Sequence, residues 1–242
     1  MDASLVASRI PKTRDLNGSS RNKTAIIPMT LLAGVDEAGR GCVIGPLVVA
    51  GVLIEERRSG DLVNLGVRDS KQLSPRKREA LAAEIKAVAR KWAYFDLQPW
   101  AIDKVVERAQ KFRKLNYLEA MAMARVIRDL RPDRAYIDPA DVVAERYCGQ
   151  MMRVLPWKPE LVCEKKADVK YPVVSAASIL AKVRRDSIVA ELREQHGDFG
   201  SGYPSDWRTI EFLESLLGGT DAPPSFVRRS WSTVRRMLRE DP

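Results

Sequence analysis

Two adjacent carboxylates, Asp36 and Glu37, stand where an apolar stretch of the chain runs into a glycine-rich turn. Neighbouring acids repel each other, so keeping both ionised costs free energy unless a cation offsets the charge. Gly39 and Gly41 let the main chain approach a ligand more closely than any other residue would. The plain alternative is a solvated turn or a helix cap. The functional interpretation predicts both a cation and a closely bound substrate.

The charge of the chain favours a polyanionic partner. Lys and Arg outnumber Asp and Glu 41 to 32 over 242 residues, which gives a formal charge of +9 and a pI near 9.6. Such a balance attracts nucleic acid by long-range attraction and by release of counterions. A membrane surface or a ribosomal partner would also suit this charge.

The supply of metal ligands restricts the chemistry to carboxylates. His196 is the single histidine, which argues against Ser-His-Asp triads and against sites with several imidazoles. Cys42, Cys148 and Cys163 lack the close spacing of a zinc site, so we expect free thiols in a reducing compartment and no structural zinc. Oxygen ligands select hard cations such as magnesium or manganese.

Short apolar strands alternate with amphipathic helices along the chain. The pattern predicts strands over 31–35, 46–54, 92–97, 135–137 and 159–163, and helices over 74–90, 115–130, 175–194 and 205–217. Ser74 and Ser205 are the expected N-caps of two of these helices. The alternation predicts an α/β layered sheet with acids at the strand ends.

The ends of the chain carry their own expectations. Residues 1–28 are polar and basic, so we expect a flexible tail before one catalytic domain over 29–242, whose C-terminal lobe, about 200–242, is helical. Met29 is a possible alternative translation start. A secretory h-region and a membrane-length apolar run are both missing from the sequence, which predicts a cytoplasmic protein without membrane contact.

Five blocks of the sequence resemble the signature of ribonuclease HII, the type 2 ribonucleases H, and they follow one another in the family's order. They are Asp36-Glu-Ala-Gly-Arg-Gly41 with Gly45-Pro46, Tyr136-Ile-Asp138, Lys166-Ala-Asp168, the stretch from Tyr171 to Asp186, and Gly200-Ser-Gly-Tyr-Pro204. The resemblance implies an RNase H-like mixed sheet flanked by helices. The compact length and Ser230-Trp231 look most like the archaeal single-chain type.

The resemblance also implies the catalytic acids, which fall on Asp36, Glu37, Asp138 and Asp168. Four carboxylates in one pocket carry a charge of about −4, which is typical of a site for two divalent metals, here Mn²⁺ or Mg²⁺. The implied reaction is endonucleolytic hydrolysis of the RNA strand of RNA–DNA hybrids and nicking 5′ to ribonucleotides embedded in duplex DNA, leaving 3′-hydroxyl and 5′-phosphate ends.

Each of the later acids has an ordinary alternative. Asp138 precedes Pro139 and would also suit a turn, while Asp168 would also suit an ion pair with Lys165 or Lys166. Two further acids compete for a place in the site. We expect Asp141 to cap the helix after Asp138, and Asp186 to pair with an arginine inside its own helix.

Substrate-binding residues are also implied by the resemblance. In similar enzymes the Gly39-Arg40-Gly41 turn reads the ribose 2′-hydroxyl through backbone groups, and Tyr203 stacks on the sugar beyond the junction. Lys71 is placed to touch a phosphate. The alternatives are a turn aromatic packed on the core for Tyr203 and a solvated lysine for Lys71. Cys42 departs from the family pattern, which often has proline there.

The C-terminal segment combines an apolar stripe with arginines. Trp231, Val234 and Leu238 share one helical face and are expected to pack inward. The expected solvent-facing or duplex-facing residues are Arg228, Arg229, Arg235, Arg236 and Arg239.

Two rival functions stay open at this stage. A ribonuclease HIII is disfavoured because residues 1–28 are too short for the extra N-terminal domain of that class, and a non-catalytic hybrid-binding protein would lack at least one of the four acids. The expected partners are RNA–DNA hybrid and ribonucleotide-containing duplex DNA. A sliding-clamp partner is possible, and nothing in the sequence demands more than a monomer.

Overall fold

The computed structural model describes residues 29–67, 74–108, 115–218 and 222–238. Its centre is a five-stranded sheet in the order β3-β2-β1-β4-β5. The strands are β1 (Leu31–Ala38), β2 (Leu47–Glu55), β3 (Lys91–Leu97), β4 (Arg134–Ile137) and β5 (Glu160–Cys163). The first three strands are antiparallel neighbours, whereas β4 and β5 run parallel to β1. The predicted mixed α/β sheet is confirmed.

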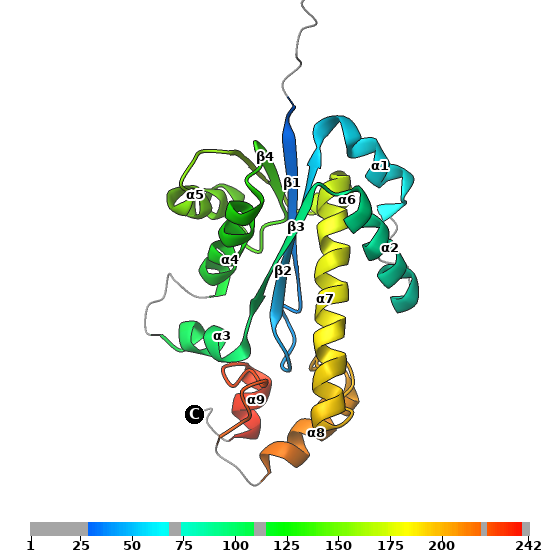
Figure 1. Ribbon diagram of the computed structural model, residues 1–242. Coiled ribbons are helices and arrows are strands. Elements are labelled where there is room, and N and C mark those ends of the chain that lie inside the picture. The colour runs from blue at the N-terminus through cyan, green and yellow to red at the C-terminus, as the bar shows by residue number, and fades with distance from the viewer. Residues whose placement is uncertain (1–28, 68–73, 109–114, 219–221, 239–242) are drawn as a thin grey trace, which may run out of the picture.

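Helices cover both faces of this sheet (Figure 1). One face carries α3 (Pro99–Val106), α4 (Leu115–Leu130) and α5 (Ala144–Val154), and the other carries α1 (Ser59–Asn64), α2 (Pro75–Val88) and the long α7 (Pro172–His196). Two short elements, η1 (Glu56–Arg58) and α6 (Ala167–Lys170), follow β2 and β5. Beyond one end of the sheet lie α8 (Trp207–Leu217) and α9 (Ser232–Met237).

The alternation of side chains along β1 sorts them into two separate cores. Leu32 and Ala38 belong to the core beneath α7, whereas Ala33 and Val35 belong to the core beneath α4. β2 is buried over almost its whole length and reads as a continuous apolar run, as expected for a strand covered on both faces. The same alternation sends Asp36 toward α7 and Glu37 toward α4.

A third core joins the C-terminal elements to the glycine-rich turn. It contains Val43 and Ile44 from the turn, Phe199 and Leu213 from around α8, and Val234 from α9. Val43 and Ile44 also donate backbone hydrogen bonds to the Gly202 carbonyl oxygen, over 2.8 and 3.2 Å. The turn that follows β1 is therefore held by residues from near the end of the chain.

The helix predictions are confirmed for the elements that flank the site. The structure has a helix over Leu115–Leu130, and the hydroxyl of Ser74 accepts a hydrogen bond from the Lys77 backbone N–H (3.4 Å) at the start of α2. The predicted Ser205 cap is wrong. Asp206 is the N-cap of α8, because its carboxylate accepts from the backbone N–H groups of both Ser201 and Arg208.

The expectation of three free thiols is wrong for two of the cysteines. Cys148 in α5 and Cys163 at the end of β5 form a disulfide, with Cα atoms 6.0 Å apart. α5 returns along the sheet and packs on β5, so the fold itself brings together residues whose spacing in sequence carries no signal. Cys42 is free and buried. The argument from cysteines for a reducing compartment falls with this pair.

Within the described part of the chain, every helix is too short or too polar to cross a bilayer.

Candidate active site

The carboxyl ends of three parallel strands bring the predicted acids to one edge of the sheet. Val35 of β1 and Ile137 of β4 are partners in register, so Asp36 and Asp138 follow side by side. The backbone N–H of Asp138 donates to the Val35 carbonyl (3.4 Å). Asp168 lies in the first turn of α6, directly after β5.

A left-handed residue connects the second and third of these acids. Lys166 has φ +60° and donates its backbone N–H to Oδ1 of Asp138, 3.2 Å away. Asp168 follows two residues later, and its carbonyl accepts a hydrogen bond from the Ser175 hydroxyl of α7. Because Lys166 is bound to Asp138 through its main chain, the segment before Asp168 is anchored to the strand end that carries Asp138.

Asp36 is supported from the α7 face of the sheet. It forms a hydrogen bond with the Ser178 hydroxyl, which in turn accepts from Nζ of Lys182 (2.9 Å). The backbone N–H of Glu37 donates to Oδ1 of Asp36 over 2.8 Å. Burial raises the pKa of Asp36 to about 6; the two hydrogen bonds oppose that rise, and the charge of Asp138 adds to it.

Glu37 faces a different set of groups on the α4 side. Burial, and next the charge of Glu119, raises the pKa of the Glu37 carboxyl well above its usual range. Glu119 is fully buried in α4, and burial raises its pKa to about 7. Arg40 lies between the two acids: its Nη1 pairs with Glu119 and lies 3.7 Å from Oε1 of Glu37, and its Nη2 donates to Oδ1 of Asn116 (2.8 Å).

Glu119 and Asn116 are site residues that the sequence reasoning missed. Both belong to a helix whose spacing indicated only a packed apolar face, and neither lies in a glycine-rich or acidic motif. One signal was present, because a glutamate among core positions of a helix requires a buried partner. That partner is Arg40, which is 79 residues away in sequence.

The acid cluster fits a hard cation in charge and in donor type. Oε2 of Glu37 is buried and has no hydrogen-bond partner among the described residues. Burial and mutual repulsion both disfavour ionisation of Asp36 and Glu37, and a divalent cation would reverse that balance. Within the described ranges, however, no three Asp, Glu, His or Cys side chains form a ready-made ligand group.

The glycine-rich turn and Tyr203 lie next to each other. Gly39 has φ +85°, and a Cβ at that position would lie 2.6 Å from Nε of Arg185. A Cβ at Gly41 would lie 4.0 Å from Cε1 of Tyr203. The guanidinium of Arg185 covers the Tyr203 ring at 4.6 Å from its centroid and donates to the Ser201 carbonyl. Tyr203 is half-buried, and burial raises the pKa of its hydroxyl.

Two of the competing acids have partners of their own. Asp141 accepts from the Val143 backbone N–H (3.0 Å) and binds Nη2 of Arg146, but Val143 rather than Asp141 is the N-cap residue of α5. Asp186 pairs with Arg78 of α2 at 3.4 Å, across the helix interface, and only more distantly with Arg185 of its own helix. Lys71 lies outside the described residues.

The prediction that the C-terminal arginines face solvent or duplex is wrong for Arg228. Its side chain is fully buried and donates to three carbonyl oxygens of the glycine-rich turn. The neighbouring Arg229 is exposed, as expected, and Val234 packs inward. Arg228 precedes α9, so the helical spacing that sorted the other residues does not apply to it. Arg239 lies outside the described residues.

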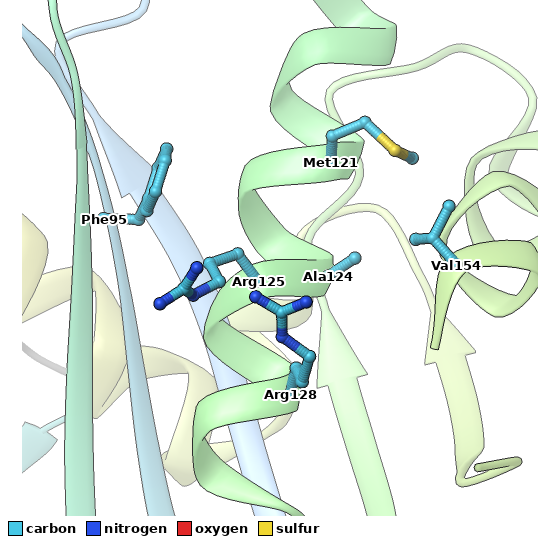
Figure 2. Close-up of a pocket in the computed structure, with 6 residues that line it drawn as sticks. All are labelled: Phe95, Met121, Ala124, Arg125, Arg128 and Val154. Carbon is cyan, nitrogen blue, oxygen red and sulfur yellow. The ribbon is translucent and has the colours of Figure 1, made fainter. Parts of the chain in front are cut away.

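A separate hollow of about 300 Å³ lies between α4, α5 and β3 (Figure 2). Phe95 and Met121 line it, together with Arg125 and Arg128 from successive turns of α4. None of the four acids contributes to its wall. We therefore place the candidate active site at the strand ends that carry the acids, and not in this hollow.

Comparison with known proteins decides the family. A family model described as ribonuclease HII matches residues 33–234 and so covers both the strand-end acids and the C-terminal lobe. The chain belongs to the ribonuclease HII family. Ribonuclease HII of Pyrococcus furiosus is 45% identical over 206 residues, which are 85% of this chain and 90% of that protein. The chain is thus a metal-dependent endoribonuclease that acts on the RNA of RNA–DNA hybrids.

Solved structures of ribonuclease HII share the fold. The ribonuclease H2 of Pyrococcus horikoshii superposes with a TM-score of 0.79 at 40% identity, covering 87% of this chain and 98% of that one. The ribonuclease HII of Archaeoglobus fulgidus, solved in a complex with PCNA, superposes with a TM-score of 0.76 at 42% identity and the same coverage. The RNase H-like fold implied by the motifs is confirmed.

Proposed function

We propose that this ribonuclease HII also nicks duplex DNA 5′ to single embedded ribonucleotides, and that Asp36, Glu37, Asp138 and Asp168 hold the divalent cations. The observation that carries the proposal is the position of the Gly39–Gly41 turn. It continues directly from the strand that bears two of the acids, and its far side meets Tyr203. A group that reads one ribose therefore lies beside the groups that would cut the adjoining phosphodiester.

The acids supply oxygen ligands that suit Mg²⁺ or Mn²⁺. Bound cations of this kind activate water and stabilise the leaving oxygen of an in-line phosphoryl displacement. Asp36 is oriented for this role by Ser178 and by the Glu37 backbone N–H. Arg40 offsets part of the charge of Glu37, while Glu119 and Asn116 hold Arg40 in place.

The turn and the tyrosine supply selectivity for ribose. Backbone groups of Gly39, Arg40 and Gly41 approach the 2′-hydroxyl, which is the local difference between RNA and DNA. The ring of Tyr203 is partly exposed and packs against Arg185, and its exposed part would stack on the sugar beyond the junction. Lys71 contributes a phosphate contact.

The remaining partners follow from charge and from relatives. The formal charge of +9 favours duplex binding through phosphates. The Archaeoglobus fulgidus relative is known in a complex with PCNA, which supports a sliding clamp as a partner of this chain as well.

One assay tests the proposal. A duplex with a single ribonucleotide is compared with an all-DNA duplex and with a long RNA–DNA hybrid, in Mg²⁺, in Mn²⁺ and in chelator. Metal-dependent nicking 5′ to the single ribonucleotide, with the all-DNA duplex uncut, is the expected result. Cleavage restricted to the long hybrid would leave the metal site standing but would remove the proposed reading of a single ribose.

A further inference from the structure

The Arg228 side chain hydrogen-bonds to the main chain of the glycine-rich turn. The side chain is 0% exposed, and a buried guanidinium is stable only where hydrogen bonds replace its water shell. Nη2 donates to the Gly39 carbonyl (2.7 Å), Nη1 to the Arg40 carbonyl (2.8 Å) and Nε to the Gly45 carbonyl (3.1 Å). The planar fork therefore spans the turn from its first residue to its last.

The backbone around Arg228 is fixed to the same turn. The N–H of Arg228 donates to the Val43 carbonyl over 2.9 Å, and Val227 forms an isolated antiparallel bridge with Ile44. The guanidinium also packs over the Trp231 ring, 4.9 Å from its centroid. With both main chain and side chain anchored, Arg228 has little freedom to move relative to the turn.

The hydrogen bonds from Arg228 also orient the backbone N–H groups of the turn, because the peptide unit is rigid. A trans peptide unit is planar, and its carbonyl points opposite to the N–H of the next residue. Arg228 draws the carbonyls of Gly39 and Arg40 toward itself, so the N–H groups of Arg40 and Gly41 must point away from it. Cys42 also donates to the Gly39 carbonyl, through its backbone N–H (3.4 Å) and its thiol (3.0 Å). Arg228, almost 190 positions later in the chain, therefore shares the Gly39 carbonyl with Cys42 and adds the bond that orients the Arg40 carbonyl.

We propose that Arg228 is a positioning residue for ribose recognition, which aims the N–H groups of Arg40 and Gly41 at the 2′-hydroxyl oxygen of the ribonucleotide. This inference rests on the proposed role of the glycine-rich turn. Arg228 itself touches no substrate. Its loss should leave duplex affinity largely intact, because surface phosphate contacts dominate that affinity, while the scissile phosphate loses its alignment with the acids.

A second buried arginine, Arg185, lies close to the same turn but has a different role from Arg228. Arg185 also lies against Gly39, but its guanidinium donates to Ser201 and covers Tyr203. It therefore holds the tyrosine loop, whereas Arg228 holds the carbonyls of the turn.

The test compares full-length Arg228→Met, Arg228→Lys and Arg236→Met with the unmodified chain. Arg236 is exposed on α9 and reaches only the Ser232 carbonyl of its own helix (3.4 Å), so its variant removes the same charge without loosening the turn. The kcat and KM are measured on a duplex with one ribonucleotide and on a hybrid with a long RNA tract. Amide hydrogen exchange reports on residues 39–46, and circular dichroism gives the folded fraction.

For Arg228→Met we expect kcat on the single ribonucleotide to fall about 10- to 100-fold with a smaller change in KM, as for a misaligned reacting group. The kcat of Arg228→Lys should lie between that of Arg228→Met and that of the unmodified chain, because an ammonium group can replace only some of the hydrogen bonds of the guanidinium. Exchange should accelerate over 39–46 and not in β1 to β3. Arg236→Met should change both substrates by the same factor.

Three outcomes would overturn the inference. One is an unchanged kcat per folded molecule in Arg228→Lys, which also decides the matter if the methionine variant does not fold. Another is faster exchange in β1 to β3 as well as over 39–46 in the Arg228 variants, which would mean a general structural role. The third is failure of the unmodified chain to nick at a single ribonucleotide; this result removes the proposed function first and the inference with it.

Discussion

The two faces of β1 give adjacent carboxylates opposite kinds of support. On the α7 face, Asp36 meets a hydroxyl and, behind it, a lysine. On the α4 face, Glu37 meets a second buried acid, and one arginine is shared between them. Burial raises the pKa of both groups. After burial, the largest influence on the pKa of Asp36 is the hydrogen bond with Ser178, which lowers it, whereas the largest influence on the pKa of Glu37 is the charge of Glu119, which raises it further.

The difference shows how one strand end can give two proposed metal ligands different surroundings. Asp36 is held by hydrogen bonds from Ser178 and from the Glu37 backbone N–H, which favour its ionised form and one orientation. Glu37 keeps one buried oxygen without a hydrogen-bond partner among the described residues. Its ionisation therefore depends more strongly on a bound cation. We expect Asp36 to be the better ordered ligand and Glu37 the more responsive one.

The charge of Asp138 raises the pKa of both Asp36 and Glu37, so we expect its removal to have the largest effect. The change Asp138→Asn should lower hybrid cleavage at least about 1,000-fold because it removes a ligand charge that no neighbour replaces. Single-turnover rates in Mg²⁺ and in Mn²⁺ provide the measurement. Asp61→Asn is the matched control, since Asp61 pairs with Arg58 at the exposed surface of α1 and its variant should cleave normally. Retained turnover in Asp138→Asn would take Asp138 out of the site.

The α7 face can be tested through stability in chelator. Asp36 has a folded pKa of about 6 against an ordinary value of 3.8, so its ionisation destabilises the fold as pH rises from about 4 to above 6. Asp36→Asn should therefore raise the free energy of unfolding by about 1–3 kcal/mol at pH 8 and by almost nothing at pH 4. Urea unfolding at both pH values measures this.

The control for that experiment has the opposite sign. Arg146 holds the pKa of Asp141 below its usual range, so ionised Asp141 stabilises the fold above that range, and the benefit is lost as pH falls. Asp141→Asn should therefore destabilise the protein at pH 8. A stabilising effect of equal size in both variants would mean that net charge, and not the local site, controls the result.

The α4 face depends on the ion pair that holds Arg40. Glu119→Gln keeps an oxygen acceptor but loses the charge, and charge-assisted hydrogen bonds are about twice as strong as neutral ones. We expect kcat on an RNA–DNA hybrid to fall about tenfold as Arg40 loses its fixed position. Steady-state kinetics with the folded fraction measured in parallel provide the test. A rate equal to that of the unmodified chain would show that Arg40 needs no such anchor.

The smallest effect is expected at Ser178, and it sharpens the comparison most. The change Ser178→Ala removes one hydrogen bond to Asp36, which should cost about three- to tenfold in kcat. It should also move the titration midpoint of Asp36 above 6, since Ser178 opposes the rise of that pKa, and change Glu37 less, because Glu37 senses the loss only through the charge of Asp36. Carbon-detected NMR of the carboxyl groups in chelator separates the two. A shift at Glu37 of similar size would contradict the separation of the faces.

Local patterns predicted the scaffold because each depends on neighbours in sequence. The strands, the helix over Leu115–Leu130 and the placement of Asp36 and Asp138 at strand ends all follow from alternation and turn residues. Parallel pairing of β1 with β4 then puts those acids side by side. The proposed metal ligands needed only this much, together with the family resemblance.

The supporting residues could not be found in this way, because their partners are far away in sequence. Glu119 is identified only by Arg40, and Arg228 only by carbonyls of the glycine-rich turn. Carbonyl acceptors carry no side-chain signal at all, so a buried arginine and a surface arginine look alike in the sequence. The Cys148–Cys163 pair was missed for the same reason, since the contact is created by the packing of α5 on β5.

Gly34 lets α7 pack directly on β1 beside the candidate site. A Cβ there would lie 2.2 Å from the Val173 carbonyl oxygen, so the first turn of α7 rests directly on the backbone of β1. Ser178 follows Val173 by little more than one helical turn, and Asp36 follows Gly34 by two residues of strand. A methyl group at position 34 would push the first turn of α7 away from β1. The Ser178 hydroxyl would then move away from Asp36. The absence of a Cβ at position 34 thus keeps α7 close enough to β1 for Ser178 to reach Asp36.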